Sequence, residues 1–247
     1  MPFDPVEQAK DTEKVVTRGV SRKYYRSARP EKWYGGISSA YCCGCNLRCV
    51  FCFSGFPRDH PESIGEFYEP QQVFRELVAC ANKYGYTQLR ITGNEPTLNK
   101  EHLLNLLTFV ERTDFLYILE SNGILIGHDQ EFAKQLSKFN RVHVRILLKG
   151  TDAEEFSKLT GADSKAFDLQ LKALENLTSF GVPYNPAVML SFSSQEGLEE
   201  LKERLEDIEH GLANRLEEEH VILYPPVVKR LKESGIKPSF DQSHKGE

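Results

Sequence analysis

The chain has 247 residues and a formal net charge of −5, which fits one compact domain with short extensions at about 150 residues per domain. Its 40% hydrophobic and 27% charged residues exclude collagen-like, disordered and disulfide-framework proteins. No run reaches the roughly 18 apolar residues of a membrane helix, and the N-terminus lacks a secretory signal, so we expect a cytoplasmic protein with no membrane partner and reduced thiols.

The first 33 residues are expected to form an N-terminal extension that is both basic and aromatic. Its cations are interleaved with Tyr24, Tyr25, Trp33 and the neighbouring Tyr34, and they are Arg18, Arg22, Lys23, Arg26, Arg29 and Lys32. Residues 34–224 are expected to form the core. Residues 225–247 are charged and interrupted by prolines, which predicts an irregular C-terminal tail.

Through the core, β-like runs alternate with stretches of helical periodicity, as in a parallel α/β protein. Helices are predicted at 70–83, 100–111, 130–138, 166–180 and 195–208. Six strands are predicted at 36–41, 88–92, 116–121, 142–148, 184–192 and 220–223. Six βα units form either an open partial barrel or a doubly wound sheet, and periodicity alone does not distinguish them. In both arrangements the ligand site lies at the C-terminal ends of the strands.

Five of the six cysteines lie directly after the first predicted strand, at Cys42, Cys43, Cys45, Cys49 and Cys52. The C-x3-C-x2-C spacing of the last three lets one loop supply three thiolates to an iron–sulfur cluster and leave one iron open. The alternative is a structural zinc knuckle in which Cys42 or Cys43 supplies a fourth thiolate. The role of these two residues stays open at this point.

This loop, with Phe51 just before the last cysteine, resembles the signature of the radical S-adenosylmethionine (radical SAM) superfamily, and the resemblance spans residues 34–223. It implies an α/β fold built as a partial (β/α)6 barrel. It also implies a [4Fe-4S] cluster on Cys45, Cys49 and Cys52 and S-adenosylmethionine bound at the open iron. The expected activity is reductive cleavage of S-adenosylmethionine to a 5′-deoxyadenosyl radical, which abstracts a hydrogen atom.

Two later strand ends resemble further motifs of this family. Gly93, Asn94 and Glu95 precede Pro96 as in the Gly-Gly-Glu-Pro stretch that holds the methionyl ammonium, with Asn94 in place of a glycine. Ser121 and Asn122 precede Gly123 as in the turn beside the ribose. The alternatives are a plain strand-to-helix turn at Gly93 and an ordinary Asn-Gly turn at Asn122.

The fourth predicted strand places His143, Arg145 and Lys149 on one face. Cations in a closed site favour an anionic ligand, so Arg145 and Lys149 are candidates for binding the methionyl carboxylate or an acidic substrate. The alternative for Arg145 is a structural ion pair with Glu120 or Glu95. The polar loop 149–162 that follows is expected to contact the substrate.

The short chain is similar to pyruvate formate-lyase activating enzymes, which implies a protein substrate and an external low-potential electron donor, ferredoxin or flavodoxin. A second hypothesis is a radical enzyme that modifies transfer RNA, with the basic segment Arg18–Tyr34 as an RNA-binding arm. A third, non-enzymatic hypothesis is a zinc-stabilised interaction module.

Overall fold

The computed structural model describes residues 1–239, 241 and 242. Six strands form the parallel part of one sheet in the order β3-β5-β6-β7-β8-β9, and β3 pairs on its other side with the antiparallel β2. The strands are β3 (Ile37–Cys42), β5 (Gln88–Thr92), β6 (Leu116–Ser121), β7 (Val142–Leu148), β8 (Tyr184–Met189) and β9 (Glu217–Glu219). The sheet path ends at β1 and β9, so the barrel is open.

Helices cover one face of this sheet because alternate strand residues there are apolar. Leu89, Ile91, Leu119 and Val144 are at most 2% exposed. α3 (Pro70–Tyr84) contacts β3 and β5, α4 (Lys100–Val110) contacts β6, and α8 (Phe167–Ser179) contacts β7 and β8. The remaining predicted helices are α6 (Gln130–Leu136) and α9 (Gln195–Ile208). The predicted alternation of strands and helices is therefore confirmed, apart from small shifts of the ends.

The sixth parallel strand is displaced from its predicted place. It was expected at 220–223, but the strand that pairs with β8 is β9, at Glu217–Glu219. Three consecutive glutamates have low β-propensity and no apolar alternation, so the sequence does not indicate a strand there. Charged side chains suit an edge strand because they discourage pairing with another molecule. The predicted segment instead contains β10 (Val221–Ile222), which pairs with β11 (Asp241–Gln242).

The expected N-terminal extension contributes regular structure. Helix α1 (Pro5–Val16) begins at the N-cap Asp4, and β1 (Thr17–Arg18) leads into β2 (Ser21–Glu31). β2 extends the main sheet beside β3 and pairs on its other side with β4 (Glu66–Tyr68). The 3-10 turn η1 (Trp33–Gly35) then leads into β3. The basic and aromatic residues of this segment thus lie in a sheet.

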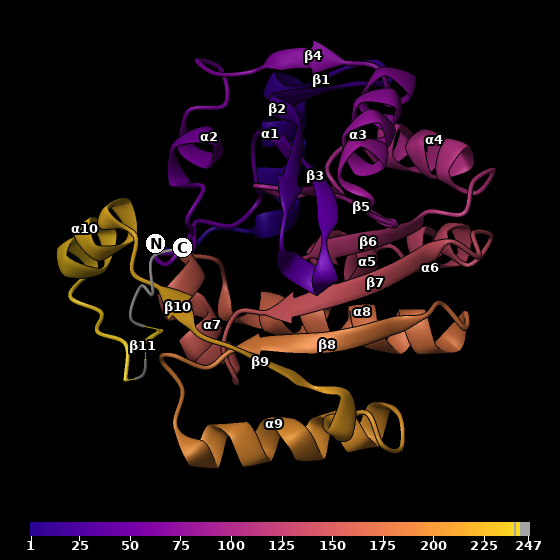
Figure 1. Cartoon of the computed structure of the whole chain (residues 1–247). Coiled ribbons are helices and arrows are strands. Elements are labelled where there is room, and N and C mark those ends of the chain that lie inside the picture. Colours follow the sequence, from indigo (N-terminus) through magenta and orange to yellow (C-terminus); the bar gives the residue numbers. More distant parts are fainter. Residues whose placement is uncertain (240, 243–247) are drawn as a thin grey trace.

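Two segments predicted to be irregular are helical. The loop expected at 149–162 contains α7 (Ala153–Thr160), which the Asp152 carboxylate caps at the Glu155 amide. The expected tail contains α10 (Pro225–Ser234), whose first turn tolerates two prolines because its amides need no helical partner. In Figure 1, β7 and β8 point toward the side of the molecule where α10 lies. The shorter elements are α2 (Gly55–Asp59), α5 (Ile124–His128), η2 (Ser164–Ala166) and η3 (Ala213–Arg215).

Within the described residues, no helix is long and apolar enough to cross a membrane.

Candidate functional site

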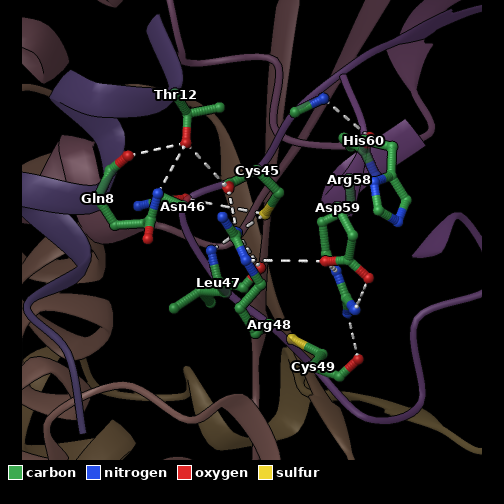
Figure 2. A network of polar contacts seen from close by, with 12 residues as sticks. Gln8, Thr12, Cys45, Asn46, Leu47, Arg48, Cys49, Arg58, Asp59 and His60 are labelled. Carbon is green, nitrogen blue, oxygen red and sulfur yellow. Dashed lines mark hydrogen bonds and ion pairs between the residues drawn. The ribbon is translucent and has the colours of Figure 1, made fainter. Parts of the chain in front are cut away.

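The cysteine loop, residues 43–54, joins β3 to α2 and carries the C-x3-C-x2-C motif. Its first turn passes through Gly44, whose φ is +81°, and a Cβ there would lie 2.7 Å from Thr12 Cγ2. Glycine is therefore required where α1 packs on the loop. Asn46 Nδ2 donates to the Pro5 carbonyl at 3.3 Å. Thr12 Oγ1 lies 3.5 Å from the Cys45 carbonyl oxygen, as Figure 2 shows. Helix α1 thus fixes the first part of the loop.

Two guanidinium groups hold the second part of the loop. Arg58 of α2 donates to the Cys49 carbonyl at 2.5 Å (Figure 2). Arg230 of α10 donates to the Val50 carbonyl at 3.2 Å and to the Cys52 carbonyl. Because both cations lie beside cysteines, they favour negative charge on the loop. The contact of Arg230 was not foreseen, since α10 was expected to be an irregular tail.

Cys42 and Cys43 point into two different parts of the core. Both are 0% exposed, and Cys42 belongs to the main core while Cys43 packs with Ala9, Val16 and Leu98. Burial raises the pKa of the Cys43 thiol to about 12. Both side chains thus pack into the core instead of facing the three motif cysteines. The zinc hypothesis therefore lacks its expected fourth ligand.

The turn after β5 is bonded to the cysteine loop. Gly93 has a φ of +88°, which favours glycine. Asn94 Oδ1 accepts from the Gly44 amide at 3.0 Å, and Asn94 Nδ2 donates to the Ser54 carbonyl at 3.1 Å. The side chain therefore joins the two ends of the loop. A second glycine could not make this bridge, which accounts for the departure from the family pattern.

Glu95, expected to contact the cofactor, binds donors from its own chain. The residue is 3% exposed. Its Oε1 accepts from Thr97 Oγ1 and Ser121 Oγ, both at 2.7 Å, and from the Thr97 amide at 3.2 Å. Its Oε2 accepts from the Asn122 amide at 2.9 Å. Glu95 and Ser121 thus connect the turns after β5 and β6.

Asn122, expected near a ribose, faces the cysteine loop. Its Nδ2 lies 2.8 Å from Asn46 Oδ1 and 3.8 Å from Cys45 Sγ. Its Oδ1 accepts from the Ile124 amide at 3.0 Å. The strand-end turns predicted from separate motifs therefore meet at the cysteine loop.

Lys149 follows the end of β7 and faces the same loop. Its Nζ lies 6.0 Å from the centre of the Phe51 ring, which stacks on Phe192 at 5.7 Å. Burial raises the pKa of the Cys49 thiol, and the nearby charge of Lys149 acts in the opposite direction. The structure shows no carboxylate bonded to this ammonium among the residues it describes. Lys149 is therefore available to an anion.

Arg145 lies in the middle of β7 and forms ion pairs with two carboxylates. Its guanidinium group is 2.6 Å from both Glu217 and Glu219 of β9. Burial acts to lower the pKa of Arg145, but these two carboxylates and Tyr34 raise it overall. An ion pair was one of the two expectations for this residue, but the expected partners, Glu120 and Glu95, were wrong.

The polar face of the sheet, opposite its helices, carries a second set of ion pairs. Arg90 bonds Glu120 at 2.7 Å and also bonds Glu31. Tyr34 donates through its hydroxyl to Glu120 at 2.5 Å. His143 Nε2 lies 2.7 Å from Asn185 Oδ1, so this histidine has a structural partner. Arg90 was missed by motif reading because a buried charged residue inside a strand has no motif of its own.

The three motif cysteines are the candidate thiolate ligands of an iron–sulfur cluster. Burial raises the pKa of the Cys45 thiol, and the charges of Glu95, Cys49 and Cys52 add to this effect. Thiols that repel one another when ionised are stabilised as thiolates by bound iron. Within the described residues, no three histidine, cysteine or carboxylate side chains are already arranged around a single metal ion.

Comparison with known proteins gives relatives and a shared fold. The chain is 27% identical over 143 residues to a probable GTP 3′,8-cyclase of Thermoplasma volcanium, covering 56% of this chain and 39% of that protein. It is 28% identical over 137 residues to the mycofactocin maturase MftC of Mycolicibacterium smegmatis, covering 56% of this chain and 32% of that protein. The chain thus spans less than half the length of these relatives.

The solved structure of Streptococcus suis SuiB bound to S-adenosylmethionine matches with a TM-score of 0.62 at 19% identity, covering 80% of this chain and 42% of SuiB. SuiB bound to its precursor peptide SuiA matches with a TM-score of 0.59 at 18% identity, covering 81% of this chain and 47% of SuiB. The shared fold is the open α/β barrel that the family resemblance implied, and not the doubly wound sheet that the strand pattern also allowed. The radical SAM superfamily model matches residues 40–208. The chain therefore belongs to the radical SAM superfamily, and its cofactors are S-adenosylmethionine and a [4Fe-4S] cluster.

Proposed function

We propose that the chain is an enzyme that cleaves S-adenosylmethionine reductively and abstracts a hydrogen atom from a peptide or protein substrate. When bound, the cofactors supply the chemistry: one electron splits S-adenosylmethionine into methionine and a 5′-deoxyadenosyl radical, which takes the hydrogen atom. A low-potential ferredoxin or flavodoxin would supply that electron. The observation that carries the proposal is the cysteine loop at the C-terminal end of β3, to which the turns after β5 and β6 are hydrogen-bonded.

The residues of the loop and the strand ends divide into two roles. Cys45, Cys49 and Cys52 would hold the cluster. Lys149, whose ammonium contacts no carboxylate within the described part of the chain, would bind the carboxylate of S-adenosylmethionine, and Phe51 would pack against that cofactor. Five other predicted cofactor residues shape the loop or the turns beside it: Gly93, Asn94, Glu95, Ser121 and Asn122. Arg145 remains a candidate for binding the cofactor only if it can leave its two carboxylates.

The charges on the polar face favour a substrate that is neutral or cationic where it contacts the sheet. Each buried arginine of this face lies between two glutamates, so neither guanidinium group is free to bind phosphate. A triphosphate placed here would lie beside four carboxylates. A peptide side chain fits this surface better than GTP does.

The two finer hypotheses from the sequence, an activating enzyme and an enzyme that modifies transfer RNA, both receive little support. The relatives are cyclases and a maturase, so they do not support an activating enzyme of the pyruvate formate-lyase type, although a protein substrate is common to that hypothesis and this proposal. The transfer RNA hypothesis relied on an exposed basic arm. Lys23 instead donates to the carbonyls of Pro61 and Glu62, and Arg22 is 1% exposed, so this segment offers fewer cations to RNA.

The test is anaerobic reconstitution with iron and sulfide, followed by reduction with dithionite. Electron paramagnetic resonance spectra are recorded before and after S-adenosylmethionine is added, and 5′-deoxyadenosine is assayed in the same samples. We expect a cluster signal that changes with S-adenosylmethionine, and 5′-deoxyadenosine as product. Added GTP should leave the rate of product formation unchanged.

Cys49→Ala should remove the cluster signal while the protein stays folded, because the core is large enough without the metal. Cys80→Ala, on α3 outside the loop, is the matched control and should keep the signal. Uptake of zinc without sulfide would overturn the enzymatic proposal. Stimulation by GTP would overturn the choice of substrate.

A further inference from the structure

The side-chain amide of Asn122 has one allowed orientation. The residue is 4% exposed. Its Oδ1 accepts from the Ile124 amide at 3.0 Å, so rotating the amide by 180° would place an NH2 group against an N–H donor. Asn122 Nδ2 must therefore point away from Ile124, toward the cysteine loop.

The acceptors on the loop are also fixed. Asn46 Nδ2 donates to the Pro5 carbonyl at 3.3 Å, which leaves Asn46 Oδ1 to accept from Asn122 Nδ2 at 2.8 Å. Asn122 Nδ2 has a second hydrogen and lies 3.8 Å from Cys45 Sγ, which is also 3.9 Å from Asn46 Oδ1. Cys45 Sγ also lies 3.4 Å from the Leu47 amide nitrogen. One ligating sulfur thus faces two N–H donors.

We propose that Asn122 is a positioning residue that raises the reduction potential of the cluster through an N–H···S hydrogen bond to Cys45. The inference rests on the proposed function. A donor at a thiolate withdraws electron density from it and so stabilises the reduced cluster, which carries one more negative charge. The effect is large here because the amide is buried, where hydrogen bonds are electrostatically stronger.

The test is a redox titration of the reconstituted protein without S-adenosylmethionine, followed by electron paramagnetic resonance. In Asn122→Ala the ratio of reduced to oxidised cluster at a given potential should fall three- to tenfold, and tenfold corresponds to about 59 mV for a one-electron couple. Asn122→Asp should lower it further, since it keeps the acceptor for Ile124 but puts a negative charge beside Cys45. The control Asn140→Ala, at an exposed site bonded to Glu111, should titrate like the wild type.

Iron and sulfide content is measured on every variant. Equal midpoints in wild type and both loaded Asn122 variants would overturn the proposal. Asn122 variants that fold but take up no cluster would also overturn it, because the residue would then serve assembly of the site. A wild type that takes up no cluster would instead refute the proposed function. In the wild type, pulsed electron paramagnetic resonance should show an exchangeable proton coupled to the cluster that Asn122→Asp lacks.

Discussion

At the scale of single residues, the conformation of the cysteine loop depends on side chains that hydrogen-bond to the backbone of the loop. The cysteine spacing alone predicted which thiols share a loop. It did not predict Arg230, which bonds Cys52 across 178 positions of sequence. Contacts between distant segments depend on how the elements pack, so a local sequence pattern does not predict them. The turn motifs were located correctly, yet Glu95 and Asn94 bind the chain itself.

Asn94→Ala should destabilise the apoprotein because two backbone groups at the ends of the cysteine loop each lose one of two hydrogen bonds: the Gly44 amide keeps the Pro57 carbonyl, and the Ser54 carbonyl keeps the Arg58 amide. Because each group keeps another partner, each lost hydrogen bond should cost about 0.5 kcal/mol, so the free energy of unfolding should fall by roughly 1 kcal/mol. Urea unfolding at pH 7 measures this difference. Thr108→Ala on the exposed side of α4 should change stability by less than about 0.5 kcal/mol. Equal losses in both variants would show that the bridge between Gly44 and Ser54 contributes nothing specific.

Lys149→Met should weaken binding of S-adenosylmethionine to the reconstituted protein. A charge-assisted hydrogen bond contributes about 1.5–3 kcal/mol, so Kd should rise roughly ten- to a hundredfold. Equilibrium dialysis measures Kd directly. Lys138→Met, before β7 and away from the loop, should bind normally. An unchanged Kd in Lys149→Met would assign the carboxylate to another residue.

At the scale of elements, apolar periodicity predicted the first five strands of the parallel sheet and the five helices α3, α4, α6, α8 and α9. It did not predict the helices α1, α5 and α7, although each has buried apolar residues. It failed for β9 and α10, whose sequences are charged or rich in proline. It also failed to show that β2 joins the sheet, because its cations and tyrosines resemble an exposed arm. Burial of Arg22, Lys23 and Tyr24 is possible only because backbone carbonyls and His102 supply their hydrogen bonds.

The contact between β2 and α4 predicts a pH dependence. Tyr24 Oη lies 2.8 Å from His102 Nε2, and His102 Nδ1 lies 2.8 Å from the Val20 carbonyl oxygen, so the neutral histidine accepts from Tyr24 and donates to Val20. Burial lowers the pKa of His102 from 6.5 to about 4. The unfolded chain therefore binds the proton first as the pH falls. The stability that the neutral histidine contributes is complete above pH 6.5 and is lost as the pH falls toward 4.

When the pH falls from 7 to 5, protonation of His102 in the unfolded chain should lower the free energy of unfolding by roughly 2 kcal/mol, at 1.36 kcal/mol per pH unit below 6.5. His102→Gln cannot titrate, so its stability should depend less steeply on pH across this range, whatever its absolute value. Urea unfolding of both proteins at pH 7 and pH 5 gives the two slopes. Parallel slopes would contradict a buried neutral histidine.

At the scale of the whole molecule, the open sheet has two different faces. Helices cover the apolar face, while the polar face holds buried arginines between carboxylates. The class of fold was predictable because six βα units allow few arrangements. The ion-pair partners on the polar face were not predictable, since Arg90 and Arg145 pair with glutamates of other strands, and pairing between strands depends on register.

This charge distribution predicts how strongly the protein binds nucleic acid. The formal net charge is −5, and the segment expected to bind RNA keeps Arg22 and Lys23 buried, while Arg18 lies over the Phe67 ring at 4.1 Å and Arg26 over the Tyr41 ring at 5.8 Å. Binding driven by phosphate contacts weakens steeply with salt, because each contact releases counterions. With few free cations and an overall negative charge, we expect bulk transfer RNA to bind weakly and with little dependence on salt between 50 and 200 mM. Fluorescence anisotropy of labelled transfer RNA measures both quantities. A tenfold or greater loss of affinity over that range would restore the RNA hypothesis, and Arg26→Gln with Arg29→Gln would then show whether β2 carries the contact.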